Sequence, residues 1–544
     1  MTALQRGAAT RRYLAAMDAR TPRQVDWQAA PPRYKLYPQA PRTGLEGTWT
    51  GDLLRGLLGL TRIRWHRPTG TGGHGVVSVG RPAPSGGALY PIEAYPVTDA
   101  GVCHYDVVHH ALETVRDGDH RGVFTALLPG PPADRPDLVV VLTGVFWRNG
   151  FKYGDFAYRL ICQEIGILAA QALALSGLLG LRLSPHLTFD GEAADRLLGL
   201  DPADEGTLAV LTFSRCHPPP ADPPHSEGAR AAGTAREPES GTLPRAVGTA
   251  REPESGTRPR AGRAREPEPR AAGDSAPSGL PCLAALHAAA RRPFLGGPMG
   301  DPVPPVPTGP VVPLPAPRPV RPAEGIAHRA SANGFRPVLL GSADLATILA
   351  VAADTGGLPG QPAATALYVL ALRVVGVAAG AYRFDPEAMA LAGVGDGRAV
   401  ATVAAGRLGD GTAAALRTAA AVIIPVGDPL AGIDRFGDLW YRLQQAETGF
   451  VIHRATLSAA ALGLTSRIHS GGTNPATDAA LGLAGTPWRS LSFLLLGTPR
   501  ATGGFLAGPA AGVTVDGHRT SRQWAGAPAI PSGSRPAEGV IKMP

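Results

Sequence analysis

Short apolar runs recur along two stretches of the chain and define its predicted elements. Residues 138–142 and 421–425 are rich in β-branched side chains and have the length of buried strands. One uncharged run, residues 165–181, approaches the length of a membrane span. It contains Gln171 and Ser176, however, and falls short of the roughly 20 residues that a span requires. We therefore expect a fully buried core helix there.

Each stretch follows the same order of predicted elements: a helix, three strands, a long central helix and a closing strand. The closing strands are expected at residues 208–213 and 490–496. Because this order mixes hairpin-linked strands with helix-linked strands, the predicted fold class is α+β.

The two stretches also share sequence landmarks. KYGDFAYRL at residues 152–160 parallels RFGDLWYRL at residues 435–443, and each is followed by a long apolar segment that ends in Leu-Gly-Leu. Upstream, the Ala-Leu-Tyr string of residues 88–90 matches that of residues 366–368, and a Gly-x-x-x-x-Asp turn follows each. Landmarks that recur in one order at nearly constant offset indicate an internal duplication.

Composition marks the boundaries between these units. A chain of 544 residues is too long for one ordinary core. The string GTAREPESGT occurs at residues 233–242 and again at 248–257, among almost no large apolar side chains, which predicts a disordered linker. We expect a lead-in segment (residues 1–45), a first lobe (46–216), the linker with one short helix (217–325), a second lobe (326–504) and a flexible tail (505–544).

Charge and cysteine content exclude several classes of function. The formal net charge of +8 is spread over the chain without a dense Lys/Arg stripe, so no nucleic-acid partner is expected. The four cysteines are scattered without metal-ligand spacing, and neither a metal site nor a disulfide framework is predicted. The N-terminal segment has no apolar signal-peptide core. We expect a soluble, cytoplasmic protein without a membrane partner.

The segment RPAPSGGALY at residues 81–90 carries the clearest chemical signal. Two glycines after Ser85 let the backbone approach a planar or anionic ligand, and the serine hydroxyl can donate to it. Extended to RPAPSGGALYPIEAY, the string strongly resembles the flavin loop of the nitroreductase superfamily, in the form seen in SagB-type dehydrogenases. The resemblance includes the lead-in DWQAAPPRYKLY at residues 26–37. It covers nearly all of residues 26–215, and a diverged copy covers about 326–500.

The resemblance implies an FMN held between two such lobes, which the two halves of this chain would supply as an intramolecular pseudo-dimer. One lobe would contribute the flavin loop. The other would contribute an Arg-x-Ser element, a glycine turn after the central helix and a basic residue after the last strand. Guanidinium groups suit the FMN phosphate because they present a fixed bidentate fork. The cofactor-binding residues implied are Arg81, Pro84, Ser85, Gly86, Gly87, Leu89, Arg329, Ser331, Arg336, Gly471, Gly472 and Arg500.

The two halves have diverged in complementary ways. In the second half the loop reads Gln-Pro-Ala-Ala-Thr at residues 361–365, without the serine and both glycines. The first half keeps the loop but lacks a clean Arg-x-Ser element. We therefore expect one complete site and one decayed site in each chain. Another arrangement stays open, in which two chains form a homodimer through their first lobes and Arg62 or Arg64 takes the place of Arg329.

Lys152 and Tyr153 are the predicted catalytic pair, and the second half has replaced them by Arg435 and Phe436. SagB-type enzymes oxidise thiazolines and oxazolines to azoles in ribosomally made peptides, which removes one proton and one hydride from carbon. A desolvated lysine could take the proton, and so could a tyrosine whose phenolate is favoured by a neighbouring ammonium. The sequence does not choose between them.

The function implied by the resemblance is that of an FMN-dependent azoline dehydrogenase. Its substrate would be a modified precursor peptide, its final acceptor dioxygen and its partner a cyclodehydratase. Two other functions fit the sequence. One is an FMN-dependent, NAD(P)H-using reductase of nitro compounds or dehydroamino acids. The other is a flavin-less binding subunit of a peptide-modifying complex.

Overall fold

The protein is described from a computed structural model, and the two near-repeats predicted to form a linker lie outside the described residues, as does most of the tail. The described residues are 6–21, 24–66, 76–216, 279–292, 296, 304–354, 358, 364–405, 410–500 and 505–507.

The first half forms one antiparallel sheet of seven strands in the order β1-β6-β5-β4-β7-β9-β8. Its centre is β7 (Leu138–Val145), where the apolar run predicted as a buried strand is buried throughout. The other strands are β1 (Arg42–Gly44), β4 (Ile92–Val97), β5 (Gly101–Asp106), β6 (Ala111–Asp117), β8 (Leu181–His186) and β9 (Glu205–Arg215).

The second half repeats this order as β10-β14-β13-β12-β15-β18, with β16 on the far side of β18. Two short strands are added: β11 pairs with β18, and β17 pairs with the central strand β15. The central strand is β15 (Ala421–Gly427), again buried along its length. The others are β10 (Val311–Pro313), β11 (Phe335–Arg336), β12 (Ala366–Ala371), β13 (Gly380–Asp385), β14 (Ala390–Gly395), β16 (Thr465–His469), β17 (Arg489–Ser490) and β18 (Phe493–Pro499). The predicted α+β class is confirmed.

Strand register relates the two sheets residue by residue. Leu138 of β7 pairs with Phe213, and Ala421 of β15 pairs with Leu496, so each residue of the second pair lies 283 positions after its counterpart. The predicted match between residues 88–90 and 366–368 is wrong. The later string lies inside β12, whereas the earlier one lies in the turn before β4. In the paired register, Tyr368 is the counterpart of Tyr95, because both face the same position of the central strand.

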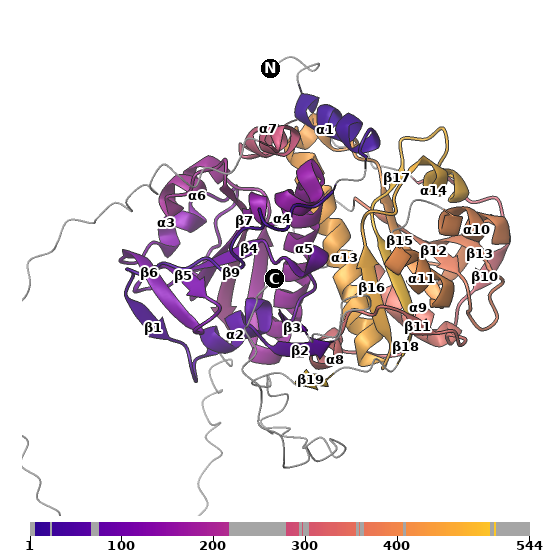
Figure 1. Ribbon diagram of the computed structural model, residues 1–544, viewed down its shortest axis with the longest axis horizontal. Helices are drawn as coiled ribbons and strands as arrows, with labels where there is room; N and C mark the ends of the chain where they lie inside the picture. The colour runs from indigo at the N-terminus through magenta and orange to yellow at the C-terminus, as the bar shows by residue number, and fades with distance from the viewer. Residues whose placement is uncertain are drawn as a thin grey trace, which may run out of the picture. The chain divides into compact units, whose positions relative to one another are not determined.

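The two long central helices, α5 (Ala157–Leu179) and α13 (Leu439–Ala461), pack directly on one another (Figure 1). A Cβ on Gly166 would lie 1.7 Å from the carbonyl oxygen of Ala446, and a Cβ on Gly449 would lie 1.8 Å from that of Gln163. The glycines are 283 positions apart and make reciprocal contacts. The stretch Phe146–Leu179 is long and apolar enough to cross a membrane, but 83% of its most apolar window is buried inside the protein.

The remaining helices surround the two sheets. In the first half they are α2 (Trp49–Leu58), α3 (Arg121–Thr125), α4 (Phe146–Tyr153) and α6 (Gly191–Leu198). In the second half they are α8 (Gly325–His328), α9 (Ser342–Ala353), α10 (Gly397–Ala405), α11 (Asp410–Thr418), α12 (Ile433–Phe436) and α14 (Pro475–Ala480). Single 3₁₀ turns occur at Gly86–Ala88, Gly154–Phe156 and Pro322–Glu324.

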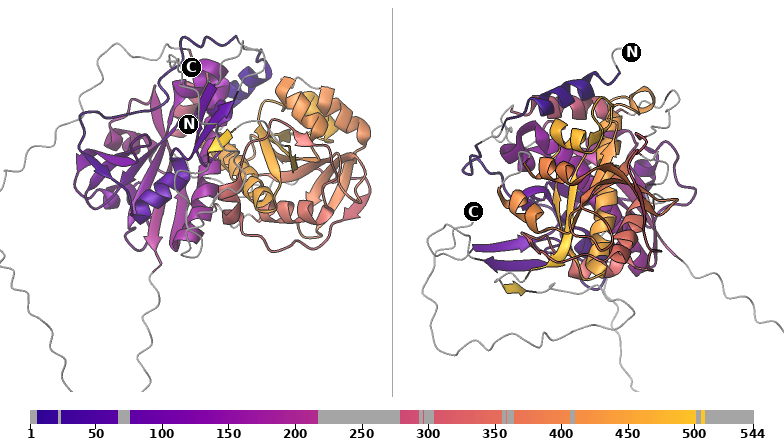
Figure 2. Two further views of the ribbon diagram at one scale, coloured as in Figure 1. Left: turned by 60° about the horizontal axis from the view of Figure 1, so that its bottom comes forward. Right: turned by 90° about the vertical axis from the view of Figure 1, so that its right-hand side faces the viewer.

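Three further segments complete the described fold. Helix α1 (Ala8–Asp18) lies within the predicted lead-in segment, and α7 (Pro281–Ala290) is the short helix expected within the linker. The predicted linker ends too late, however, because β10 pairs with β14 and so belongs to the second sheet. Figure 2 shows the small third sheet, in which β2 (Arg62–His66) lies between β3 (Val76–Gly80) and β19 (Phe505–Ala507).

Candidate functional site

A cavity of about 1590 Å³ lies against both halves of the chain. This exceeds the usual few hundred to about 1,000 Å³ of a small-molecule site, so a cofactor and part of a substrate have room together. Its walls are residues 16–21 and 25 before the first sheet, 84–88 of the loop, 152–156 with 160, 163, 164 and 167 of α4 and α5, and 331, 333, 405, 467–471 and 473–476 of the second half.

The predicted flavin loop forms one wall, and its serine is already engaged. The Ser85 hydroxyl donates to the carboxyl of Glu164 at 2.7 Å and accepts from the backbone N–H of Tyr90 at 2.9 Å. Burial raises the pKa of Glu164 to about 7, against the lowering effects of Ser85 and Arg81. A ligand in the cavity would therefore meet the backbone of this loop rather than a free serine hydroxyl.

Gly87 shows why the loop needs glycine. Its φ of +65° lies in the left-handed region of the backbone, which residues other than glycine rarely adopt. A Cβ at this position would lie 2.5 Å from the hydroxyl of Tyr153 and 3.0 Å from Nζ of Lys152. The loop backbone and the predicted catalytic pair are thus in direct contact, and only glycine leaves both in place.

Lys152 and Tyr153 occupy the last turn of α4, which ends at Gly154 with a φ of +58°. The Lys152 ammonium lies between two aromatic rings, 5.2 Å from the ring centre of Tyr153 and 5.3 Å from that of Trp27. Burial lowers the pKa of Lys152, which favours a neutral amine, and raises the pKa of Tyr153, which keeps the phenol protonated. Of the two, only Lys152 is shifted toward the form that can accept a proton.

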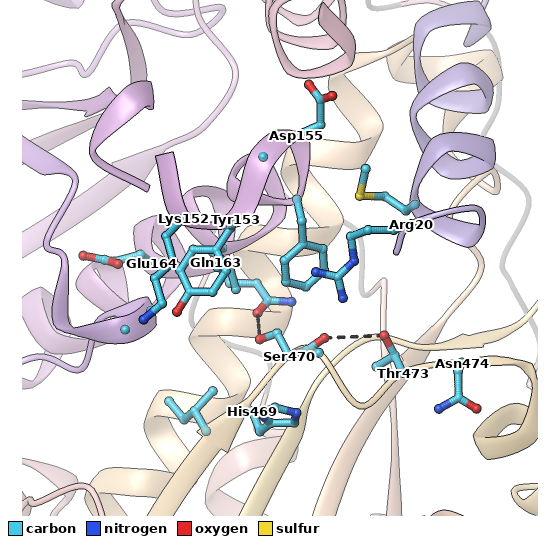
Figure 3. A pocket seen from close by; sticks show the side chains of 18 of the residues that line it. Arg20, Lys152, Tyr153, Asp155, Gln163, Glu164, His469, Ser470, Thr473 and Asn474 are labelled. Atoms are coloured by element: carbon cyan, nitrogen blue, oxygen red, sulfur yellow. Dashed lines mark hydrogen bonds between the residues drawn. The ribbon is translucent and has the colours of Figure 1, made fainter. Parts of the chain in front are cut away.

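The opposite wall is the turn after β16, and hydrogen bonds fix it to α5 (Figure 3). The Ser470 hydroxyl donates to Oε1 of Gln163 at 2.6 Å, and Arg159 donates to the Thr473 hydroxyl at 3.1 Å. Gly471 lies between these contacts and lines the cavity. The second half therefore contributes a fixed backbone turn that faces the loop of the first half.

Two arginines give the cavity an anion-binding character. Arg20 and Arg467 both line it, and within the described part of the chain neither forms an ion pair with a carboxylate. Arg467 donates instead to the Ala332 carbonyl and to Oδ1 of Asn333. Burial, together with these two arginines, lowers the pKa of His469 to about 4, so this imidazole is neutral at pH 7. Two cations left without acidic partners suit a phosphate.

Eight of the fourteen predicted site residues line this cavity, and six do not. Arg329 is buried and donates to the carbonyl of Pro82 at 2.7 Å, next to the cavity-lining Ser331. Arg336 and Arg500 are exposed on and beside the paired strands β11 and β18. The lining residues are Pro84, Ser85, Gly86, Gly87, Lys152, Tyr153, Ser331 and Gly471, and the others are Arg81, Leu89, Arg329, Arg336, Gly472 and Arg500.

The sequence interpretation missed Arg20, Glu164 and Arg467. A signal for Arg467 was present, because period-two alternation along a strand places it on the same face as His469, two positions before the glycine turn. Glu164 also had a signal in the duplication, since Glu447 lies at the same place in α13. Arg20 had none, because it reaches the cavity only through the packing of the N-terminal segment.

The fold is that of a nitroreductase. The chain superposes on the crystal structure of a candidate nitroreductase from Anabaena variabilis with a TM-score of 0.67, at 20% identity, over 90% of this chain and 99% of that one. At that identity the likeness shows the fold. No protein-family model matches the chain.

Two curated proteins are similar in sequence to part of this chain. The chain is 28% identical over 144 residues to the trifolitoxin-processing protein TfxB of Rhizobium leguminosarum, and 28% identical over 148 residues to the microcin B17-processing protein McbC of Escherichia coli. The matches span 39% and 54% of these relatives, and about a quarter of this chain. The resemblance to the nitroreductase superfamily, in its SagB-type peptide-processing form, is confirmed.

Proposed function

We propose that this chain is an FMN-dependent dehydrogenase that oxidises thiazoline or oxazoline rings to azoles in a ribosomally made peptide. The observation that carries the proposal is the contact of Lys152 and Tyr153 with the backbone of Gly87 inside a cavity with room for a cofactor and a ring. Similarity to two peptide-processing proteins supports the substrate class.

The residues present fit an FMN. The left-handed Gly87 leaves a flat, side-chain-free surface in the loop, and Gly471 offers another on the opposite wall. Arg20 and Arg467, which form no ion pair with a carboxylate of the described residues, offer guanidinium groups to the phosphate. Ser331 lies on the same side of the cavity as Arg467. The two halves would thus act as an intramolecular pseudo-dimer that holds one flavin.

The chain's own groups divide the work of removing two hydrogens from a ring. FMN, when bound, supplies the two-electron acceptor for the hydride. Lys152, whose neutral form is favoured by burial, takes the proton from the ring carbon. Tyr153 keeps its proton and donates a hydrogen bond, and Gly87 allows both side chains to reach the ring. The ring gains one carbon–carbon double bond, and no atom is added.

The test is spectroscopic and chemical. We expect the purified protein to show flavin absorbance and to remove two hydrogens per ring from an azoline peptide under air, measured by mass spectrometry, while Lys152→Ala keeps the flavin and loses turnover. A colourless protein that takes up no added FMN would show a flavin-less binding subunit. Rapid bleaching of the flavin absorbance by NADPH in the absence of oxygen, together with no azoline turnover, would show a reductase.

The expected partners follow from the proposal. A modified precursor peptide would reach the site from a cyclodehydratase, whose product carries the azoline ring. The cytoplasmic location and any further homodimer stay predictions of the same kind.

A further inference from the structure

We infer that Trp27 is a positioning residue for Lys152, and that the lead-in segment holds its indole ring over the ammonium. This inference rests on the proposed function for its catalytic meaning, but its geometry stands independently. Trp27 is 61% exposed, and it is the one aromatic among the exposed large hydrophobic side chains of the described residues. An exposed indole fixed beside a half-buried lysine calls for an explanation.

The position of the indole is set from two sides. Its ring meets the buried ring of Phe151 edge-on, with 5.7 Å between centres, and the Lys152 ammonium lies 5.3 Å above its face. Asp26 holds the turn by accepting from the backbone N–H of Gln28 at 2.9 Å. A cation over an indole face is the most favourable cation–π pairing. Together with the Tyr153 ring, the indole confines the ammonium above Gly87.

The segment that carries Trp27 is anchored to a buried polar cluster eight to ten residues later, at Lys35 and Tyr37. Lys35 donates to Glu205 at 2.6 Å and to the Tyr95 hydroxyl at 2.7 Å. The backbone N–H of Tyr37 donates to Glu113 at 3.0 Å. Glu205, Tyr95 and Glu113 are all buried, so these bonds exchange little with water. These bonds hold the chain at Lys35 and Tyr37 against the first sheet and so restrict its path toward Trp27.

Lysine usage singles out the same two positions. The chain contains 52 Lys and Arg residues, but only three are lysines: Lys35, Lys152 and Lys542. Arginine is therefore the ordinary cation of this protein, and a lysine presents a compact ammonium in place of a planar guanidinium. Of the two lysines in the described residues, Lys35 anchors the lead-in segment to the first sheet. The other, Lys152, lies over the Trp27 ring that this segment carries.

Three lysines make the test direct. Flavin-loaded, full-length protein is treated with an amine-acetylating reagent, and the rate at each lysine is read by mass spectrometry. We expect Trp27→Ala to raise the acetylation rate of Lys152 by roughly three- to tenfold, to leave Lys35 unchanged, and to lower kcat for azoline oxidation more than it changes KM. Trp27→Phe, which keeps an aromatic ring, should restore most of the protection of Lys152 from acetylation and most of kcat. Leu36→Ala removes an exposed side chain of the same segment and serves as the matched control.

Each other outcome has a defined meaning. An unchanged Lys152 rate in Trp27→Ala overturns the inference. A parallel rise at Lys35 also overturns it, because the whole segment would then have come away. If wild-type protein shows the labelling pattern but oxidises no azoline peptide, the proposed function fails while the positioning of Lys152 by Trp27 stands.

Discussion

At the scale of the residue, two buried glutamates make the same kind of contact in the two halves of the chain. Glu164 accepts from Ser85 in the loop of the first half. Glu447, 283 positions later, accepts from the backbone N–H of Ala364 at 2.6 Å and from the hydroxyl of Thr365 at 2.9 Å. The carboxyl-to-loop bond therefore persists without the Ser-Gly-Gly string. Its shared role is to hold the loop on the central helix.

These carboxyls make stability depend on pH. Burial raises the pKa of Glu447 to about 7, against hydrogen bonds from Ala364 and Thr365 that lower it. A carboxyl with a folded-state pKa above its unfolded value of about 4.5 binds its proton more tightly when folded. Its stabilising contribution to the free energy of unfolding is therefore present at low pH and is lost as pH rises from about 4.5 to 7. We expect Glu447→Gln to remove up to about 3 kcal/mol of this pH dependence, measured by urea unfolding from pH 5 to 8.

The comparison with Glu164→Gln separates stability from binding. Both substitutions should flatten the pH profile, because burial raises the pKa of each carboxyl to about 7. Only Glu164 lines the cavity, so only Glu164→Gln is expected to change flavin affinity as well. If the free energy of unfolding changed with pH equally in wild type and in Glu447→Gln, the buried, protonated state of Glu447 would be contradicted.

At the scale of the element, the crossing of α5 and α13 decides whether the two halves close on one cavity. Apolar periodicity predicted both central helices and both central strands, because burial on every face leaves a continuous apolar run that is visible locally. The crossing point was not visible, since Gly166 and Gly449 are defined as contacts only by the partner helix. The false match of residues 88–90 with 366–368 has the same origin, because register depends on pairing.

The crossing predicts a contrast within one helix. Gly166→Ala places a Cβ 1.7 Å from a backbone oxygen, which cannot rotate away, so α5 and α13 must separate. We expect a loss of at least about 3 kcal/mol in the free energy of unfolding, at the upper end of overpacking effects. Gly177→Ala lies in the same helix with no atom within 4 Å and should gain up to about 1 kcal/mol. Denaturant melts of both variants provide the check, and similar changes would show that the crossing is not tight.

At the scale of the whole molecule, the site belongs to neither half. Among the residues that the sequence predicted, residues 84–87 of the loop, Lys152, Tyr153, Ser331 and Gly471 do line the cavity, and each lies in a short string with its own signature. The arginines that it predicted to bind phosphate do not line the cavity. Arg336 and Arg500 were chosen by position along the chain, whereas the packing of the N-terminal segment and of β16 brings Arg20 and Arg467 to the cavity instead. Convergence of distant segments is a property of the tertiary fold.

A composite site predicts one flavin per chain, reached by substitutions from either half. We expect one equivalent of FMN in titrations followed by flavin fluorescence. Gly87→Ala in the first half and Arg467→Ala in the second should each weaken that single binding event, by roughly tenfold or more for a lost charge-assisted contact to phosphate.

Gly180→Ala is the control for Gly87→Ala, because its φ of +64° carries the same backbone strain with no atom within 4 Å. It should cost about 1 kcal/mol of stability without changing affinity. Two equivalents per chain, or an Arg467→Ala variant that binds as wild type does, would mean that the second half does not hold the phosphate.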